Sequence, residues 1–169
     1  RLVGSEMCIR DSTIYFTFLI IKNLRYIYER EVIFIRMKLK KSLKQFFGFD
    51  DFRDPQYKVV KYALRGFDEL VVLPTGSGKS ICYQLPALLQ GGITIIISPL
   101  KSLIKDQITN LDALGIKALG FYGEIGINER RKILRDLLLS ERDFKILYTT
   151  PETITRNVDF VDTMNTIYG

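Results

Sequence analysis

Residues 69–90 read ELVVLPTGSGKSICYQLPALLQ, and this stretch predicts the fold. Glu69 to Leu73 is a short apolar run of the kind that forms a buried strand. PTGSGKS follows as a loop, and Ile81 to Gln90 continues as a helix. A glycine-rich loop between a buried strand and a helix is the arrangement that binds phosphate groups in P-loop proteins. The stretch therefore predicts a nucleotide-binding domain.

The residue types of this loop each have a chemical reason. Gly76 and Gly78 let the backbone turn tightly, so that consecutive amide N–H groups point at phosphate oxygens at a helix N-terminus. Lys79 is expected to reach the β and γ phosphates of ATP, and Ser80 to offer a hydroxyl to Mg²⁺. The strict pattern asks for glycine at the position of Leu73, so the loop departs from it there.

Strands and helices are expected to alternate along the rest of the chain. A helix with apolar residues from Leu39 to Phe47 ends at Gly48, and a second one begins behind the cap Asp54 and runs to Gly66. Further strands are expected at Ile93–Ser98, Lys117–Phe121 and Phe144–Thr149, and further helices at Leu100–Leu114, at Glu129–Leu139 behind the cap Asn128, and from Pro151. This alternation predicts an α/β fold with a parallel sheet and helices on both faces.

Composition narrows the function classes. The chain of 169 residues has room for one domain, and its formal net charge of +6 permits a polyanionic partner such as nucleic acid. It has no histidine, and its two cysteines, Cys8 and Cys82, stand far apart. Zinc sites built on cysteine and histidine, and catalytic triads with a histidine base, are therefore excluded. Cys82 is expected to be a small buried residue.

The first thirty-six residues differ in character from the remainder. The apolar run from Thr13 to Ile21 is too short to span a membrane. RLVGSEMCIRDS at the start resembles a string that arises when sequencing-adapter DNA is translated with a reading frame. We expect residues 1–36 to be a read-through leader and Met37 to be the native start. No sequence feature predicts a membrane role or an oligomeric state.

A candidate adenine-recognition segment lies ahead of the loop. The amide of Gln56 offers a donor and an acceptor, which suits the N6 and N7 edge of adenine. Phe49 and Arg53 could hold the ring between an aromatic face and a guanidinium plane. Taken singly, these residues have ordinary alternatives: a core aromatic, a surface ion pair and a solvated helix face.

Four strings in order resemble the RecQ helicase family. They are FGFDDFRDPQ, LPTGSGKSICYQLPAL, ISPLKSLIKDQ and YTTPE, and the resemblance extends from Met37 to about Glu152. It implies a RecA-like P-loop NTPase domain that uses ATP and Mg²⁺, within an enzyme that unwinds DNA with 3′→5′ polarity in repair and recombination. Its partners would be single-stranded DNA and duplex junctions.

The resemblance also assigns roles to individual residues. It places Phe49, Arg53 and Gln56 on the adenine-recognition motif, and Thr75, Gly76, Ser77, Gly78, Lys79 and Ser80 on the phosphate-binding loop, with Lys79 and Ser80 serving catalysis. It places Ser98, Pro99, Leu100, Ser102, Asp106 and Gln107 on a motif along single-stranded DNA, and Thr150, Pro151 and Glu152 on a second one. Without the resemblance, the hydroxyl groups of the DNA-side residues would be interpreted as helix caps.

The same resemblance implies parts beyond the matched strings. A strand carrying Asp-Glu-Ala-His would activate the attacking water, and a second motor domain would supply an arginine finger. We expect residues 37–169 to be the first RecA-like domain, truncated before that acidic motif, so that the chain alone is inactive in hydrolysis. Apolar faces of ITIIIS and FKILYT would then lie partly uncovered, and we expect the isolated chain to aggregate.

Three other functions remain open from the sequence. A DEAD-box RNA helicase shares a glutamine ahead of a similar loop, although its loop usually begins with alanine where Leu73 stands. A non-catalytic ATP-binding module and a small P-loop kinase are the others. SPLKSLIKDQ and the residues before YTTPE look closer to the Bloom-type eukaryotic or viral branch than to the bacterial one, which favours the nucleus over the bacterial cytoplasm.

Overall fold

The computed structural model describes residues 33–139 and 142–168. Of the expected read-through leader, only positions 33–36 are described. The apolar run 13–21 and Cys8 lie outside the described residues. Within the described part, no helix is both long enough and apolar enough to cross a membrane.

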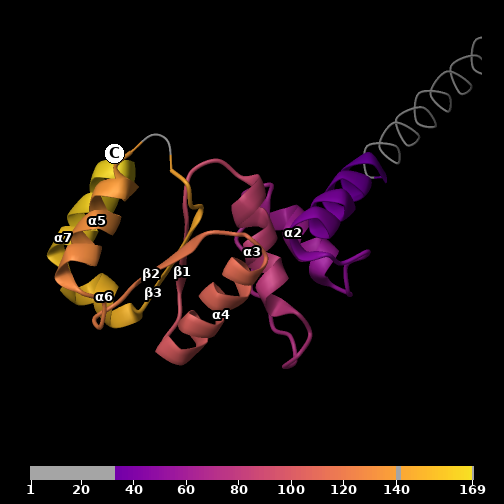
Figure 1. Cartoon of the computed structure of the whole chain (residues 1–169). Coiled ribbons are helices and arrows are strands. Elements are labelled where there is room, and N and C mark those ends of the chain that lie inside the picture. The colour runs from indigo at the N-terminus through magenta and orange to yellow at the C-terminus, as the bar shows by residue number, and fades with distance from the viewer. Residues whose placement is uncertain (1–32, 140–141, 169) are drawn as a thin grey trace, which may run out of the picture.

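From α3 to α6, helices and strands alternate in the order that the sequence predicts (Figure 1). After a helix over 33–47, the elements are α2 (Gln56–Ala63), α3 (Lys79–Leu89), β1 (Thr94–Ile97), α4 (Lys101–Ala113), β2 (Ala118–Phe121), α5 (Ile127–Leu137), β3 (Ile146–Thr149), α6 (Pro151–Arg156) and α7 (Val158–Tyr168). Gly48 ends the first helix with a φ of 75°, a conformation that glycine adopts without strain.

The three strands form a parallel sheet in the order β1-β3-β2. β3 is the central strand, and all four of its residues are buried. Its side chains alternate between the faces of the sheet. Ile146 and Tyr148 belong to the apolar cluster of α3 and α4, whereas Leu147 belongs to the cluster of α5 and α7.

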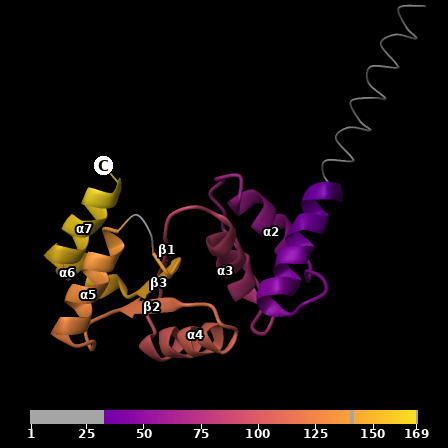
Figure 2. The same cartoon turned by 45° about the horizontal axis from the view of Figure 1, so that its top comes forward.

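Helices cover both faces of the sheet, as predicted (Figure 2). On one face, Leu85 of α3 and Ile104 of α4 are fully buried with Val60 of α2. On the other, the rings of Phe121 at the end of β2 and Phe160 of α7 stack with centroids 4.8 Å apart. Cys82 is buried, which confirms the expectation for it.

The strand expected at residues 69–73 is wrong. The segment is irregular, and the side chains of Leu70 and Val72 are 94% and 84% exposed. A strand exists only where its N–H and C=O groups pair with a neighbour, and no described strand lies alongside this one. The apolar pattern is compatible with a strand, but without backbone pairing to a neighbouring strand the segment stays irregular.

Two expected helix caps are also wrong. α2 begins at Gln56 with Pro55 at the N-cap position, and no side chain, including that of Asp54, caps it. α5 begins at Ile127 behind Gly126, so Asn128 lies inside the helix.

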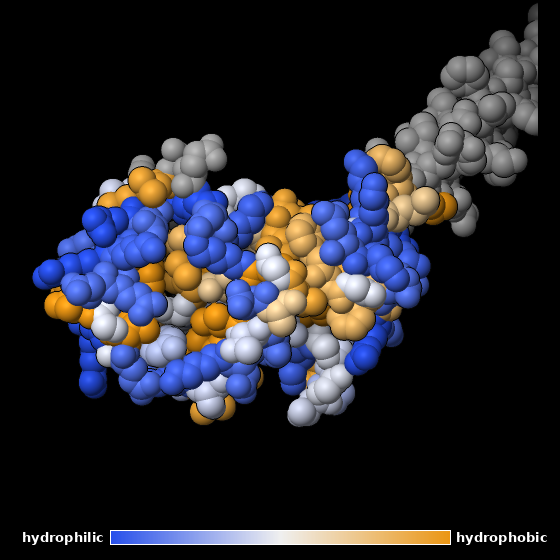
Figure 3. All heavy atoms as spheres, in the orientation of Figure 1, coloured by the Kyte–Doolittle hydropathy of each residue, from blue (hydrophilic) through white to orange (hydrophobic). Residues whose placement is uncertain are grey.

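The expectation of uncovered apolar faces holds for one strand and fails for the other. On β1, the edge strand of the described sheet, Ile95 and Ile97 share one face and are 36% and 56% exposed. The prediction is wrong for FKILYT, because β3 has a strand on each side and helices over both faces. Apolar side chains gather in the middle of the face shown in Figure 3.

Candidate nucleotide and DNA site

The candidate phosphate loop, residues 74–80, turns at its glycines. Gly76 and Gly78 have φ angles of 79° and 76°, and α3 begins directly after Gly78. The ammonium of Lys79 donates a hydrogen bond to the carbonyl oxygen of Leu73 at 2.8 Å, and Ser77 Oγ donates to the carbonyl of Pro74 at 2.7 Å. The loop thus holds its lysine folded back, at the N-terminal end of a helix of eleven residues.

Two side chains at the start of α2, those of Arg53 and Gln56, form hydrogen bonds to this loop. Arg53 Nη1 donates to the carbonyl oxygen of Gly76 at 3.0 Å. Gln56 Nε2 donates to the carbonyl oxygens of Ser77 and Gly78 at 3.3 and 3.0 Å, and its Oε1 accepts the Arg53 N–H at 2.8 Å. Both amide protons of Gln56 are therefore engaged, so reading adenine N7 would require the amide to leave the loop.

A pocket of about 240 Å³ unites the adenine-recognition segment with the loop. The candidate residues that line it are Phe49, Arg53, Gln56, Gly78 and Ser80. The Phe49 ring is 50% exposed and free to stack. Gln84 of α3 and Gln107 of α4 also line the pocket. Lys79 lies outside this pocket, beside a separate cavity against α2 and α3, and Thr75 is exposed.

The DNA-side candidates divide into inward and outward side chains. Ser98 is buried, and its hydroxyl accepts the N–H of Leu100 at 3.4 Å. Thr150 is 2% exposed and shares a hydrogen bond of 3.0 Å with Thr153. The exposed candidates are Pro99, Leu100, Ser102, Asp106, Pro151 and Glu152. Gln107 does not join them, because it faces the nucleotide-side pocket.

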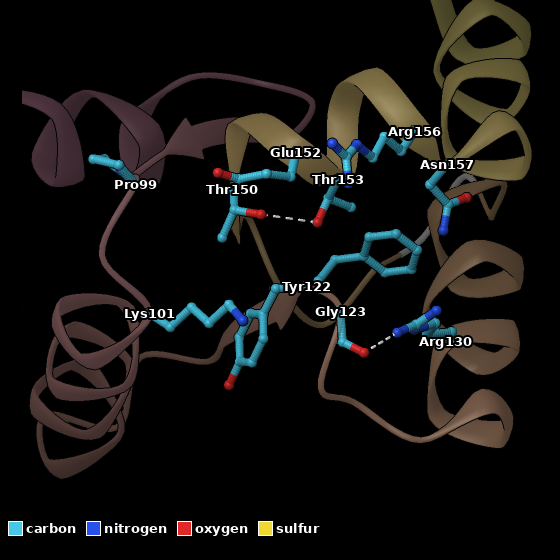
Figure 4. A pocket seen from close by; sticks show the side chains of 11 residues that line it. Pro99, Lys101, Tyr122, Gly123, Arg130, Thr150, Glu152, Thr153, Arg156 and Asn157 are labelled. Atoms are coloured by element: carbon cyan, nitrogen blue, oxygen red, sulfur yellow. Dashed lines mark hydrogen bonds between the residues drawn. The ribbon is translucent and has the colours of Figure 1, made fainter.

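A second pocket, of about 400 Å³, opens at the carboxyl ends of the strands (Figure 4). Pro99, Thr150 and Glu152 of the predicted motifs line it. So do three cations from separate helices: Lys101 of α4, Arg130 of α5 and Arg156 of α6. The Arg130 guanidinium donates to the carbonyl oxygen of Gly123. Sequence reasoning missed these cations, although Lys101 directly follows the SPL string and Arg156 lies one turn after TPE.

Glu124 binds the cations at the start of α4. Its carboxylate lies 2.9 Å from Lys101 Nζ and 3.6 Å from Lys105 Nζ. The hydrogen bond from Lys101 holds the pKa of Glu124 below its usual value, and the same bond raises the pKa of Lys101. Glu124 is therefore the anionic partner of both lysines.

No group of three or more cysteine or acidic side chains that could hold a metal occurs within 33–139 and 142–168. Ser80 at the start of α3 is the predicted Mg²⁺ contact in this part of the chain.

Comparison with known proteins identifies the family. Residues 53–167 match the family model described as "DEAD/DEAH box helicase". The chain is 40% identical over 132 residues to the ATP-dependent DNA helicase Q5 of Mus musculus, covering 77% of this chain and 13% of that protein. It is 42% identical over 119 residues to the ATP-dependent DNA helicase RecQ of Synechocystis, covering 70% of this chain and 24% of that protein. It is 45% identical over 118 residues to the ATP-dependent DNA helicase RecQ of Haemophilus influenzae, covering 70% of this chain and 19% of that protein.

The chain belongs to the DEAD/DEAH box helicase family. Its relatives confirm the resemblance to RecQ helicases within that family, and with it the RecA-like α/β fold. It spans between 13% and 24% of the length of these three relatives.

Proposed function

We propose that this chain is the ATP-binding part of a RecQ-type DNA helicase that couples ATP hydrolysis to DNA unwinding in repair and recombination. One observation carries the proposal: the pocket in which Phe49, Arg53 and Gln56 meet Gly78 and Ser80. The relatives are named as ATP-dependent DNA helicases, which supports DNA as the substrate and ATP as the energy source.

The nucleotide would lie with its base against Phe49 and its phosphates on the loop. Lys79 would exchange the Leu73 carbonyl for the β and γ phosphates, a stronger charge-assisted contact. The residues present fit Mg²⁺, because this ion keeps several waters and phosphate oxygens and needs few protein oxygens, of which the Ser80 hydroxyl would be one. The ion would neutralise charge on the phosphates.

DNA would cross the pocket at the carboxyl ends of the strands. Lys101, Arg130 and Arg156 surround it, and the phosphate backbone of DNA is the polyanion that such a cluster favours. Contacts of this kind position a strand without reading its sequence. The substrate is proposed to be single-stranded DNA and duplex junctions, unwound 3′→5′, in the nucleus or alternatively in a bacterial cytoplasm.

Hydrolysis is proposed to need an acidic Asp-Glu-Ala-His motif in addition to residues 37–169, which we interpret as the first RecA-like domain. The chain alone is then expected to bind MgATP without turning it over. Residues 1–36 are proposed to be a read-through leader.

The test is a titration of the full-length protein that carries this chain with fluorescent MgATP, followed by ATPase assays with and without single-stranded DNA. Lys79→Ala should abolish turnover, because it removes the cation that meets the transferring phosphate. Lys58→Ala, an exposed lysine of α2, is the matched control and should behave as wild type. Saturable binding that does not depend on Lys79 would contradict the assignment.

The same assay separates the other functions. Stimulation by RNA in place of DNA would favour an RNA helicase, and binding without turnover would favour a non-catalytic module. Phosphoryl transfer without stimulation by either nucleic acid would favour a kinase.

A further inference from the structure

Gln84 is the centre of a buried polar junction. This α3 residue is 4% exposed, and its Nε2 donates to Gln107 Oε1 at 2.8 Å and to the Tyr148 hydroxyl at 3.0 Å. Both protons of one amide are thereby used. Burial raises the pKa of Tyr148, and the bond from Gln84 partly offsets this, so the phenol is neutral at physiological pH and accepts the bond.

The three partners come from three elements that run into the proposed sites. α3 begins at the phosphate loop, and α4 begins directly after Ser98–Leu100. β3, which carries Tyr148, ends at Thr149 and leads into the Thr150–Glu152 segment. Gln84 therefore joins the nucleotide-side helix to both segments that border the DNA-side pocket.

The junction also reaches the nucleotide-side pocket itself. Gln84 and Gln107 line that pocket together with Gly78 and Ser80. A nucleotide that fills the pocket would contact the side of the junction. A shift of α3 would then either carry α4 and β3 along or leave a buried amide unpaired, which is unfavourable.

We propose that Gln84 is a positioning residue that couples occupancy of the nucleotide pocket to the affinity of the DNA-side segments. The proposal rests on the proposed function, since it takes ATP and DNA as the two ligands. Coupling of this kind is a ratio of affinities and is reciprocal between the two ligands. It is measured separately from the strength of either site.

The experiment uses the full-length protein, a non-hydrolysable ATP analogue with Mg²⁺ and fluorescent single-stranded DNA. The Kd for DNA is measured with and without saturating analogue, and the ratio is the coupling factor. Gln84→Leu should bring this factor to near one, a change of about fivefold or more where wild-type coupling is of ordinary size. The Kd for the analogue in the absence of DNA should change less.

Four further variants distinguish coupling from a general packing defect. Gln90→Leu alters a glutamine at the other end of α3, where its amide donates to the Ala63 carbonyl, and should leave the factor unchanged. Gln107→Leu should lower it, whereas Gln107→Glu keeps an acceptor oxygen for Gln84 and should preserve it. The double variant Gln84→Leu with Gln107→Leu should lose no more coupling than either alone.

Two outcomes would overturn the proposal: a wild-type coupling factor in a folded Gln84→Leu protein, or an equal loss in Gln90→Leu. Failure of the wild-type protein to bind the analogue or DNA at all would instead refute the proposed function. Thermal unfolding of each variant shows whether it is folded at the assay temperature.

Discussion

The Nε2 atom of Gln56 lies 3.0 Å from the carbonyl oxygen of Gly78 and donates a hydrogen bond to it. A Cβ atom added at Gly78 would come within 2.5 Å of the same nitrogen. The absence of a side chain at Gly78 is therefore what lets the segment before α2 close on the phosphate loop, and the two parts of the nucleotide site form one unit.

Gly78→Ala should destabilise the fold and weaken nucleotide binding. The φ of 76° at this position costs a residue with a Cβ about 1–2 kcal/mol, and the new methyl group would push the Gln56 amide away. Thermal unfolding and an ATP titration measure the two effects. Gly91→Ala is the matched control, because Gly91 has no atom within 4 Å of an added Cβ and should change neither.

Gln56→Ala tests whether this glutamine holds the loop or reads the base. Loss of its hydrogen bonds to the loop should weaken nucleotide binding roughly three- to tenfold, since each such bond contributes about 0.5–1.5 kcal/mol. If Gln56 only braces the loop, the Kd values for ATP and GTP rise alike. If it reads adenine, the preference for ATP over GTP falls. Gln45→Ala, on the exposed face of the first helix, should leave both values unchanged.

Most helices and strands could be predicted from the sequence because their signals are local. The period of apolar residues marks α3 and α4, and the glycine-rich loop carries its own chemistry at adjacent positions. The failure at residues 69–73 has the opposite cause. A short apolar run becomes a strand only when a distant segment pairs with it. Local sequence patterns do not show which strands pair, so the order β1-β3-β2 could not be predicted from them.

The candidate site was predictable where its residues are neighbours in a motif. The resemblance to RecQ helicases placed Phe49, Arg53 and Gln56 near the loop, and the structure brings them into one pocket with it. It did not predict that the Gln56 amide donates its hydrogen bonds to carbonyl oxygens of the loop. Nor could it predict the Gln84 junction, whose partners lie 23 and 64 residues away.

Phe160→Ala should destabilise the fold by about 3–5 kcal/mol, because it removes a ring that is 2% exposed and stacked on Phe121. Chemical denaturation of the full-length protein, followed by hydrogen exchange of the α7 amides, measures the free energy of unfolding of this domain. Val158→Ala, on the same helix but 70% exposed, should change it by less than about 0.5 kcal/mol. Equal effects of the two changes would show that α7 does not pack on the sheet in solution.

Glu124→Gln should raise the affinity of the full-length protein for single-stranded DNA, by roughly two- to fivefold at low salt. The change removes a carboxylate that lies on Lys101 and Lys105 and that DNA phosphates would have to displace. Glu129→Gln removes the same charge from the first turn of α5, where no ion pair is formed within the described residues, and should raise the affinity less. Fluorescence anisotropy over a series of salt concentrations measures both, and equal gains would mean that only net charge matters.

The pH dependence of the Glu124 ion pair has a definite sign. Its pKa is lowered from 4.5 in the folded chain, chiefly by the hydrogen bond from Lys101, so the pair stabilises the fold fully above pH 4.5. The stabilisation is lost as the pH falls below that value through the lowered pKa, because protonation of the carboxyl removes the charge. Wild type should therefore have a higher Tm than Glu124→Gln at neutral pH, and the difference should shrink only in the acid range. A Tm difference that is already absent at neutral pH, or one that grows as the pH falls, would show that Lys101 is not held by this carboxylate in solution.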